Sequence, residues 1–513
     1  MTKSTAFFPS LKRLLFGRKP LSEVQKVLRT QDDIDPLCVS QLTSLFGSFL
    51  PAHLLQFKAA SGANSRSRVY SPTVTFWAFL GQVLDPGSSC RKAVSRVQTL
   101  FALTKKDPPA TDTSAYCTAR RRLPLLWLCR IRDALAARLC PSDTPRLLVL
   151  DGTSVTLSDT PELQKRYPQM GNQKPGCGFP ILKLVGLFCL QSGAWLATAK
   201  SHRRIHDLPL SKRLHDHLRA GDTVVADRAW CSYFELVALL KLGVQVVVRR
   251  HQKRKTDFRK GKGLGHCDHL LVWKRPLRPR WMSVEEYQST PRELTVRETQ
   301  HQIQRAGWRD TQMILISTLL DVGTHSREAI ARLYARRWQV ELNFDDLKTT
   351  LGMDTLRGKS PAVVCRELVM HMIAYNLLRS LAERSGVERR ELSFKGCLDR
   401  VNTWSWIIWS APTAKQAREH VRTMLAHIAT DKVPERPDRK EPRAVKRRPK
   451  SHQLLTKPRS EMQEIRHRSN YKKAALSSAI LACVHSFPLR RLPPTNVTFF
   501  GLTTFCIKII LIL

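Results

Sequence analysis

A change of pattern at Arg146 restricts the fold of this chain more than any other feature. Before it, apolar residues recur at three- and four-residue spacing, which predicts helices. From Arg146 the segment RLLVLDGTSVTL is apolar and β-branched, and KLVGLFCLQSGAWLATAKS indicates two strands joined at Ser192-Gly193. Two further apolar runs, in TVVADRAW and VQVVVR, flank a helical segment. A hairpin followed by strand, helix and strand predicts an α/β fold, with a mixed sheet and helices packed on it.

Other changes in residue composition divide the rest of the chain. The stretch after Arg249 is first basic and rich in glycine and then contains short apolar runs, which predicts a β insertion. Lys508 interrupts the apolar C-terminus, so we interpret this end as an atypical tail rather than a membrane anchor. The expected divisions are a helical region at 1–140, an α/β domain at 141–385 with the β insertion at 250–312, a helical region at 386–430, a basic flexible arm at 431–473 and the apolar tail at 474–513.

The charge of the chain points to a polyanionic partner. It has 85 Lys and Arg against 42 Asp and Glu, a net charge of +43. Nucleic acid is the first candidate partner and an anionic membrane surface the second. A helix preceded by the capping segment Asp112 to Ser114 would carry Arg120, Arg121 and Arg122. This helix could enter a major groove of DNA, or it could be an ordinary solvated basic face.

Cysteine and histidine give no metal motif. None of the 13 Cys form a C-x-x-C pair, which argues against a zinc ribbon and against a secreted disulfide framework. We interpret HCDH, at 266–269, as incidental surface residues rather than as a metal site.

Three carboxylates stand at edges of predicted elements. Asp151 and Asp227 each follow an apolar strand, where a side chain can reach solvent from a fixed backbone, although a strand-end aspartate can also be a simple turn former. Glu341 lies in YARRWQVELNFDDLK, which predicts a helix. With about 100° of rotation per residue, one stripe of about 60° holds Tyr334, Arg337, Glu341 and Lys348. The alternative for Glu341 is a weak surface ion pair with Arg337.

Carboxylates brought together repel one another unless a cation lies between them. Mg²⁺ prefers oxygen ligands, and two such ions can activate the attacking oxygen and stabilise the leaving oxygen of a phosphodiester. In a chain attracted to DNA, this chemistry would be strand cleavage and joining. Arg337 and Lys348 would then contact phosphates of the substrate.

At this point the motifs resemble the insertion-sequence-4 family of bacterial DDE transposases. LLVLDGTSVTL and VVADRAWCSYFELVALL are similar to the family's two aspartate motifs. YARRWQVELNFDDLK carries its Tyr-x2-Arg-x3-Glu-x6-Lys signature without departure. FPILKLVGLF, AYNLLR and LLTKPR add matching context, so the resemblance covers roughly residues 70–460. The first 70 residues and those from Ala474 onward match nothing in the family pattern.

The resemblance implies an RNase H-like catalytic domain at 141–385 and a cut-and-paste DNA transposase. It implies Asp151, Asp227 and Glu341 as catalytic residues that bind two Mg²⁺ or Mn²⁺ ions. The implied DNA contacts are Tyr334, Arg337, Lys348 and Arg228, with a base stacked on a tryptophan, for which Trp273 and Trp308 are candidates. The implied partner is double-stranded DNA, namely the terminal inverted repeats and the target, bound by a homodimer on paired ends in the bacterial cytoplasm, at the nucleoid. Three alternatives stay open: a nuclease of the same fold that cuts without joining, a repressor-like relic that only binds DNA, and a membrane-surface protein.

Overall fold

The computed structural model describes residues 42–51, 54, 69–104, 107–140, 144–171, 174, 176–302, 312–389, 391–433, 457, 458 and 461. Residues up to Leu454 form one compact unit, to which all the elements below belong. The predictions for the first 41 residues, for nearly all of the basic arm and for the apolar tail lie outside the described residues.

The elements follow the order expected from the sequence. The helices are α3 (Thr43–Phe46), α5 (Pro72–Val83), α6 (Cys90–Leu103), α7 (Ser114–Arg122), α8 (Leu125–Leu139), α9 (Pro161–Arg166), α10 (Asp207–Ser211), α11 (Tyr233–Lys241), α12 (Val284–Gln288), α13 (Arg327–Ala335), α14 (Gln339–Asp345), α15 (Pro361–Arg384), α16 (Phe394–Trp409) and α17 (Ala414–Thr430). Short 3₁₀ turns are η2 (Gly47–Phe49), η3 (Lys212–His217), η4 (Arg228–Trp230) and η5 (Arg336–Trp338), and η6 (Asp346–Thr350) is a π-helical turn.

The strands form one mixed sheet of ten. They are β1 (Leu147–Leu157), β2 (Ile181–Cys189), β3 (Trp195–His202), β4 (Thr223–Ala226), β5 (Gln245–Arg249), β6 (Lys262–Gly265), β7 (Asp268–Lys274), β8 (Glu293–Gln302), β9 (Gln312–Ser317) and β10 (Thr355–Leu356). Their order is β3-β2-β1-β4-β5-β9-β8-β7-β6, with β10 paired to the far end of β1. Strands β1, β4 and β5 run parallel, while β2 and β3 form the antiparallel hairpin expected at Ser192-Gly193. The predicted mixed sheet with flanking helices is confirmed.

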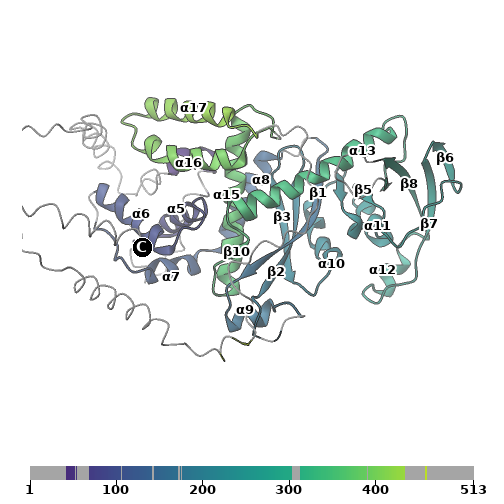
Figure 1. The fold of residues 1–513 in the computed structure, drawn as a ribbon, viewed down its shortest axis with the longest axis horizontal. Coiled ribbons are helices and arrows are strands. Elements are labelled where there is room, and N and C mark those ends of the chain that lie inside the picture. The colour runs from purple at the N-terminus through teal and green to yellow at the C-terminus, as the bar shows by residue number, and fades with distance from the viewer. Residues whose placement is uncertain are drawn as a thin grey trace, which may run out of the picture. The chain divides into compact units, whose positions relative to one another are not determined.

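The β insertion extends the same sheet. Strand β9 pairs antiparallel with β5, and β8, β7 and β6 follow it outward. Figure 1 shows β8, β7 and β6 at the end of the sheet remote from β2 and β3. The insertion is therefore anchored through β5, the neighbour of β4.

Each face of the sheet has its own core, because successive side chains of a strand point to opposite faces. On one face, Val149 and Val225 pack with residues of α13, α14 and α15. On the other face, Leu148 and Val224 pack with residues of α8, α10 and α11. Odd-numbered positions of β1 and β4 consequently face the helices that follow the insertion.

The structure corrects one expectation about β1. The sequence predicts that this strand ends at Asp151, but β1 continues for 11 residues in all, to Leu157. Beyond Asp151 it remains paired with β2, and its last residues pair with β10. What ends near Asp151 is the neighbouring strand β4, whose last residue Ala226 pairs with Leu150. Asp151 thus lies within β1, at the level where the neighbouring strand β4 ends.

The long helix α15 packs against α5, α8 and α16 (Figure 1). Several helices begin at a capping side chain. Ser71 accepts a hydrogen bond from the Val74 N–H before α5, and Ser326 accepts one from the Ala329 N–H before α13. None of the helices in the described ranges is long and apolar enough to cross a membrane.

Candidate acidic centre

Two aspartates meet at the edge between β1 and β4. The Leu150–Ala226 pairing makes Asp151 and Asp227 the next residues along two adjacent parallel strands. Both are odd-numbered positions, so their side chains face the same side of the sheet as Val149 and Val225. That side is covered by the helical segment that contains Glu341. Strand register and side-chain alternation therefore place Asp151 and Asp227 side by side on the face that the Glu341 helix covers.

Glu341 is placed by the apolar stripe of its own helix. Val340, Phe344 and Leu347 are buried in the core on this face of the sheet. The predicted single helix is instead a succession of α13, the 3₁₀ turn η5, α14 and the π-helical turn η6. Glu341 lies in the first turn of α14, with its side chain 49% exposed. It therefore borders the core on one side and solvent on the other.

Arg337 links two of the three carboxylates. Its Nη2 donates to Glu341 Oε1 at 2.9 Å, and its Nη1 donates to Asp151 Oδ2 at 3.3 Å. The i,i+4 pair with Glu341 was expected as a weak surface contact, but the Arg337 side chain is only 8% exposed. The guanidinium lies between two carboxylates, and its pair with Asp151, whose side chain is 21% exposed, interacts more strongly than a fully exposed pair would.

The pKa of Asp151 reports the same cluster. The pKa of this carboxyl is raised to about 6, chiefly by burial, and the nearby charges of Asp227 and Glu341 act in the same direction. Arg337 and the hydrogen bond from the Gly152 N–H act in the opposite direction. Asp151 is therefore repelled by both of the other carboxylates, and a bound cation would relieve this repulsion.

Tyr334 and Lys348 occupy different surroundings. Tyr334 is buried, and burial raises the pKa of its hydroxyl to about 12, with Arg337, Asp227 and Arg249 within electrostatic range. The phenol therefore stays protonated at neutral pH beside the acidic centre. Lys348 lies in the turn η6, where partial burial lowers the pKa of its ammonium group. The charge that acts on Lys348 is that of Asp354.

Basic residues after β4 and β5 flank the centre. Arg228 follows Asp227 directly, and its Nη1 lies 3.5 Å from Gln252 Oε1. Gln252 belongs to the basic loop, which we define as residues 250–261 between β5 and β6. Arg249, at the end of β5, lies near Tyr334 and was not singled out from the sequence. Its position at a strand end, like that of Asp227, was the available signal.

The three arginines of α7 differ in their surroundings. Arg121 and Arg122 are exposed, as a DNA contact requires. Arg120 is 8% exposed, donates to Gln82 Oε1 at 3.2 Å and lies over the Phe79 ring. The side chain of Arg120 is thus used inside the helical region, and it faces no groove of a partner.

Trp273 is not available to a base. Its side chain is 5% exposed, its Nε1 donates to Glu298 Oε1 at 3.2 Å, and the Arg254 guanidinium lies 3.6 Å from the ring centroid. Trp308 lies outside the described residues.

The chemistry of the carboxylate set fits a hard divalent cation, since all three groups offer only oxygen. Across the described ranges, however, no three His, Cys, Asp or Glu side chains are grouped closely enough to hold one ion. The Arg337 guanidinium lies between Asp151 and Glu341 instead. In the HCDH segment, the interpretation as incidental surface residues is wrong for Asp268 and His269, which are buried. Asp268 is paired with Arg297, and His269 contacts Glu298.

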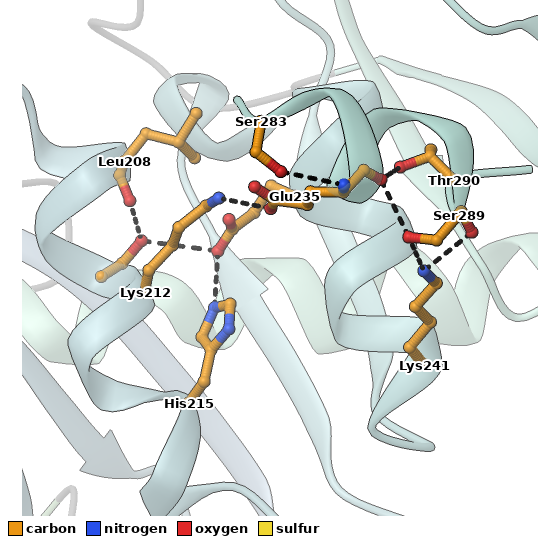
Figure 2. Close-up of polar contacts among 10 residues, drawn as sticks. Leu208, Lys212, His215, Glu235, Lys241, Ser283, Ser289 and Thr290 are labelled. Carbon is orange, nitrogen blue, oxygen red and sulfur yellow. Dashed lines mark hydrogen bonds and ion pairs between the residues drawn. The ribbon is translucent and has the colours of Figure 1, made fainter. Parts of the chain in front are cut away.

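A second polar cluster resembles a hydrolytic triad only in composition. His215 Nε2 lies 3.0 Å from Glu235 Oε1 (Figure 2). Ser211 Oγ lies 3.4 Å from the same carboxylate and donates to the Leu208 carbonyl at 2.8 Å. Ser211 is fully buried, and its hydroxyl is hydrogen-bonded to both the Leu208 carbonyl and the Glu235 carboxylate. This cluster connects η3 to α11 and offers no accessible nucleophile.

One functional feature was misjudged from the sequence. From the sequence alone, Asp345 and Asp346 both look like solvated helix charges, and Asp345 is exposed. Asp346 is instead largely buried and paired with Arg379, on the face of the helix opposite Glu341. The available signal was Arg379 itself, a cation within the strongly apolar sequence of α15.

Comparisons with known proteins agree with these motifs. Residues 142–377 match the family model described as the transposase DDE domain. The chain is 26% identical over 432 residues to the transposase InsG for insertion sequence element IS4 of Escherichia coli (strain K12), which covers 80% of this chain and 92% of that protein. A 72-residue stretch is 33% identical to the putative transposase InsL for insertion sequence element IS186A of the same organism. This match covers 14% of this chain and 20% of that protein. A piggyBac transposase synaptic complex with hairpin DNA covers 80% of this chain and 88% of its own, with 11% identity and a TM-score of 0.38, a likeness too weak to bear on the fold.

Proposed function

We propose that the protein is a DDE transposase that cuts transposon ends and joins them to target DNA by a cut-and-paste route. Support comes from the match of residues 142–377 to the transposase DDE domain and from the similarity of the chain to the IS4 transposase. The proposed catalytic residues are Asp151, Asp227 and Glu341. The observation that carries the proposal is the cluster in which Arg337 bridges Asp151 and Glu341, while Asp227 acts on the pKa of Asp151.

The proposed catalytic domain is RNase H-like. Support comes from the inner half of the sheet, where the antiparallel strands β3, β2 and β1 are followed by the parallel strands β4 and β5. In this arrangement two aspartates from adjacent parallel strands and a glutamate from a later helix converge on one face. The domain limits at 141 and 385, with the insertion at 250–312, are part of the same proposal.

The residues around the carboxylates have distinct roles. Arg337 donates to Asp151 and Glu341 and so keeps both carboxylates oriented, and its positive charge favours their ionised form. Tyr334 remains a neutral hydrogen-bond donor beside the reacting phosphate, because its pKa of about 12 keeps the proton on the hydroxyl. Arg228 and Lys348 supply positive charge for non-bridging phosphate oxygens.

The three carboxylates would hold two Mg²⁺ or Mn²⁺ ions. Bound ions would supply the Lewis acidity that makes water a nucleophile and stabilises the leaving 3′ oxygen. The oxygen-only donor set and the raised pKa of Asp151 support this assignment.

Double-stranded DNA is the proposed partner, as the terminal inverted repeats of the element and as target. The net charge of +43, the exposed Arg121 and Arg122 and the basic loop near Arg228 support it. A homodimer on paired ends follows from the family resemblance. On the same resemblance we propose that the protein acts in the bacterial cytoplasm, at the nucleoid.

The test of the catalytic assignment uses Asp151→Ala, Asp227→Ala and Glu341→Ala. Each variant should lose Mg²⁺-dependent nicking of duplexes taken from the DNA that borders the gene, by about 10³-fold or more, because phosphoryl transfer depends on charge neutralisation at the scissile phosphate. DNA affinity, measured by fluorescence anisotropy, should change little. Asp345→Ala is the matched control, an exposed acid on the same helix, and should cleave normally. Near-normal cleavage by any one of the three would remove that residue from the proposed triad.

Joining separates the proposal from its nearest alternative. A duplex with a pre-cut 3′ end, incubated with the protein, Mg²⁺ and a supercoiled plasmid, should give covalently joined products. Cleavage without joining would indicate a nuclease, and DNA binding without either would indicate a repressor-like relic.

A further inference from the structure

The face of the helix opposite Glu341 is held by buried polar contacts. With about 100° of rotation per residue, Asn343 and Asp346 lie about 140–160° away from Glu341 around the helix axis. Asn343 is fully buried and the Asp346 side chain is 20% exposed, whereas the Glu341 side chain is 49% exposed. Apolar packing alone would leave this short helix free to rotate by small angles. Directional hydrogen bonds on its buried face would not.

The first contact joins the helix to α15. Asp346 Oδ2 accepts from Arg379 Nη2 at 2.5 Å, and the Arg379 side chain is only 4% exposed. Arg379 Nε donates to the Tyr375 hydroxyl at 3.1 Å, which in turn donates to the Gly193 carbonyl at 3.0 Å. Burial raises the pKa of Asp346 to about 6 against the pull of Arg379, so the carboxylate is ionised at pH 8. Asp346 is therefore linked through two side chains to the β2–β3 hairpin.

The second contact reaches the same hairpin. Arg389 Nη2 donates to Asn343 Oδ1, and Arg389 Nη1 donates to the Leu190 carbonyl at 3.2 Å. Arg336, in the 3₁₀ turn before α14, also donates to the Leu190 carbonyl, at 3.0 Å. Three arginines from three segments thus hold one helix face to one turn of the sheet.

The π-helical turn η6 begins at the ion-paired residue. It spans Asp346–Thr350 and includes Lys348. One extra residue per turn rotates the positions that follow it relative to a regular α-helix, and such turns occur often at functional sites. The Asp346–Arg379 pair stands where this rotation starts, so it affects the direction of Lys348 as well as that of Glu341.

We propose that Asp346 and Arg379 are positioning residues, which set the rotation of the α14–η6 helix so that Glu341 meets Asp151 and Asp227 in the geometry that divalent-ion binding requires. This inference rests on the proposed function and extends it to residues that touch neither the ions nor the DNA. Residues that orient a ligand from behind typically change metal affinity or activity by about 10- to 100-fold.

The test measures ion binding directly, apart from activity. Asp346→Asn in the full-length chain should weaken Mn²⁺ binding, followed by electron paramagnetic resonance at pH 8, by about tenfold. It should also slow single-turnover cleavage at saturating DNA while leaving the Kd for DNA unchanged. Arg379→Gln should give the same pattern, and the double variant should be no worse than either single one, because the two residues act as a unit. Tyr375→Phe, which removes only the hydroxyl that Arg379 contacts, should give a smaller effect in the same direction and serves if the other variants do not fold.

Asp268→Asn is the matched control for the loss of a buried ion pair. Asp268 pairs with Arg297 in the β7–β8 part of the sheet, with side chains 5% and 0% exposed. This variant should lose stability without any change in Mn²⁺ affinity. Glu341→Gln distinguishes a failure of the positioning role from a failure of the proposed function. If Glu341→Gln loses Mn²⁺ binding and Asp346→Asn behaves like Asp268→Asn, the positioning role is wrong and the proposed function stands. If Glu341→Gln itself binds Mn²⁺ normally, the proposed function fails first.

Discussion

At the residue scale, Asp151 combines two properties that pull its protonation in opposite directions. Burial and the neighbouring carboxylates favour the neutral acid, whereas Arg337 and the Gly152 N–H favour the carboxylate. The net result is a pKa of about 6, against an ordinary value of 3.8. A group that folding makes harder to ionise lowers the stability of the folded chain wherever the unfolded chain would carry it ionised.

This imbalance predicts a pH-dependent effect of Asp151→Asn in the presence of a chelator. Because the folded pKa lies above the unfolded one, wild-type stability is lost as pH rises through about 4 to 6. Asparagine avoids this loss, so Asp151→Asn should raise the free energy of unfolding at pH 7.5 by about 1–3 kcal/mol relative to its effect at pH 4. Urea unfolding at the two pH values measures it. Equal effects at both would show that the Asp151 pKa is not raised.

What the sequence could and could not predict follows from where the partners lie. The strands and the helical segment that carry Asp151, Asp227 and Glu341 could be predicted, because strand alternation and helical periodicity are local patterns, while the catalytic role of these residues stays a prediction. The burial of Arg120 could not be predicted, because its partner Gln82 lies on another helix, and Trp273 is covered by Arg254 from a loop. Asp346 looked like any helix acid until its partner on α15 was known. Side-chain pairs between distant segments leave no periodic signal.

At the element scale, the β2–β3 turn is the fixed point to which the Glu341 helix is attached. Gly193 has a φ of +78°, a conformation that glycine adopts at low cost. A Cβ at this position would lie 2.3 Å from Arg389 Nε. The turn therefore needs glycine both for its backbone and for the arginine that crosses it. The Tyr375 hydroxyl also donates a hydrogen bond to the Gly193 carbonyl.

Gly193→Ala should consequently destabilise the fold more than the same change at Gly87, whose φ of +85° is similar but which has no atom within 4 Å of a Cβ. Both variants should lose about 1–2 kcal/mol for the left-handed backbone, and Gly193→Ala a further 1–3 kcal/mol, roughly, for displacing Arg389. Chemical denaturation of the two variants measures the difference. Equal losses would mean that the Arg389 side chain moves aside freely.

At the scale of the whole molecule, the basic residues differ in whether their charge is buried in ion pairs or exposed to solvent. Some arginines stabilise the interior, as Arg297 and Arg379 do, and are unavailable to a partner. The basic loop at 250–261 has exposed cations close to Arg228, at the edge of the acidic centre. Under the proposed function, the long-range attraction of these cations would draw DNA to a site whose own carboxylates would repel it.

The affinity for duplex DNA should therefore fall steeply with salt, and the basic loop should supply part of that dependence. Lys253→Gln with Lys255→Gln removes two exposed cations from the loop. The slope of log K against log salt should become shallower by up to about 2, at about 0.9 per lost phosphate contact. Anisotropy titrations between 50 and 300 mM salt, roughly, cover the range. Lys395→Gln, an exposed lysine on α16, is the control, and an equal change there would show that the loop has no special role.

The pairing of β1 with β10 also governs how this chain can reach its native state. Thr156 and Leu157 pair with Thr355 and Leu356, so the central strand is completed only by residues made much later on the ribosome. Such non-local contacts slow folding, because a long loop must close before the contact stabilises anything. During synthesis, the two aspartates emerge well before the helix that carries the glutamate. A nascent or truncated chain that ends before Glu341 would thus contain both aspartates of the acidic centre but lack its glutamate.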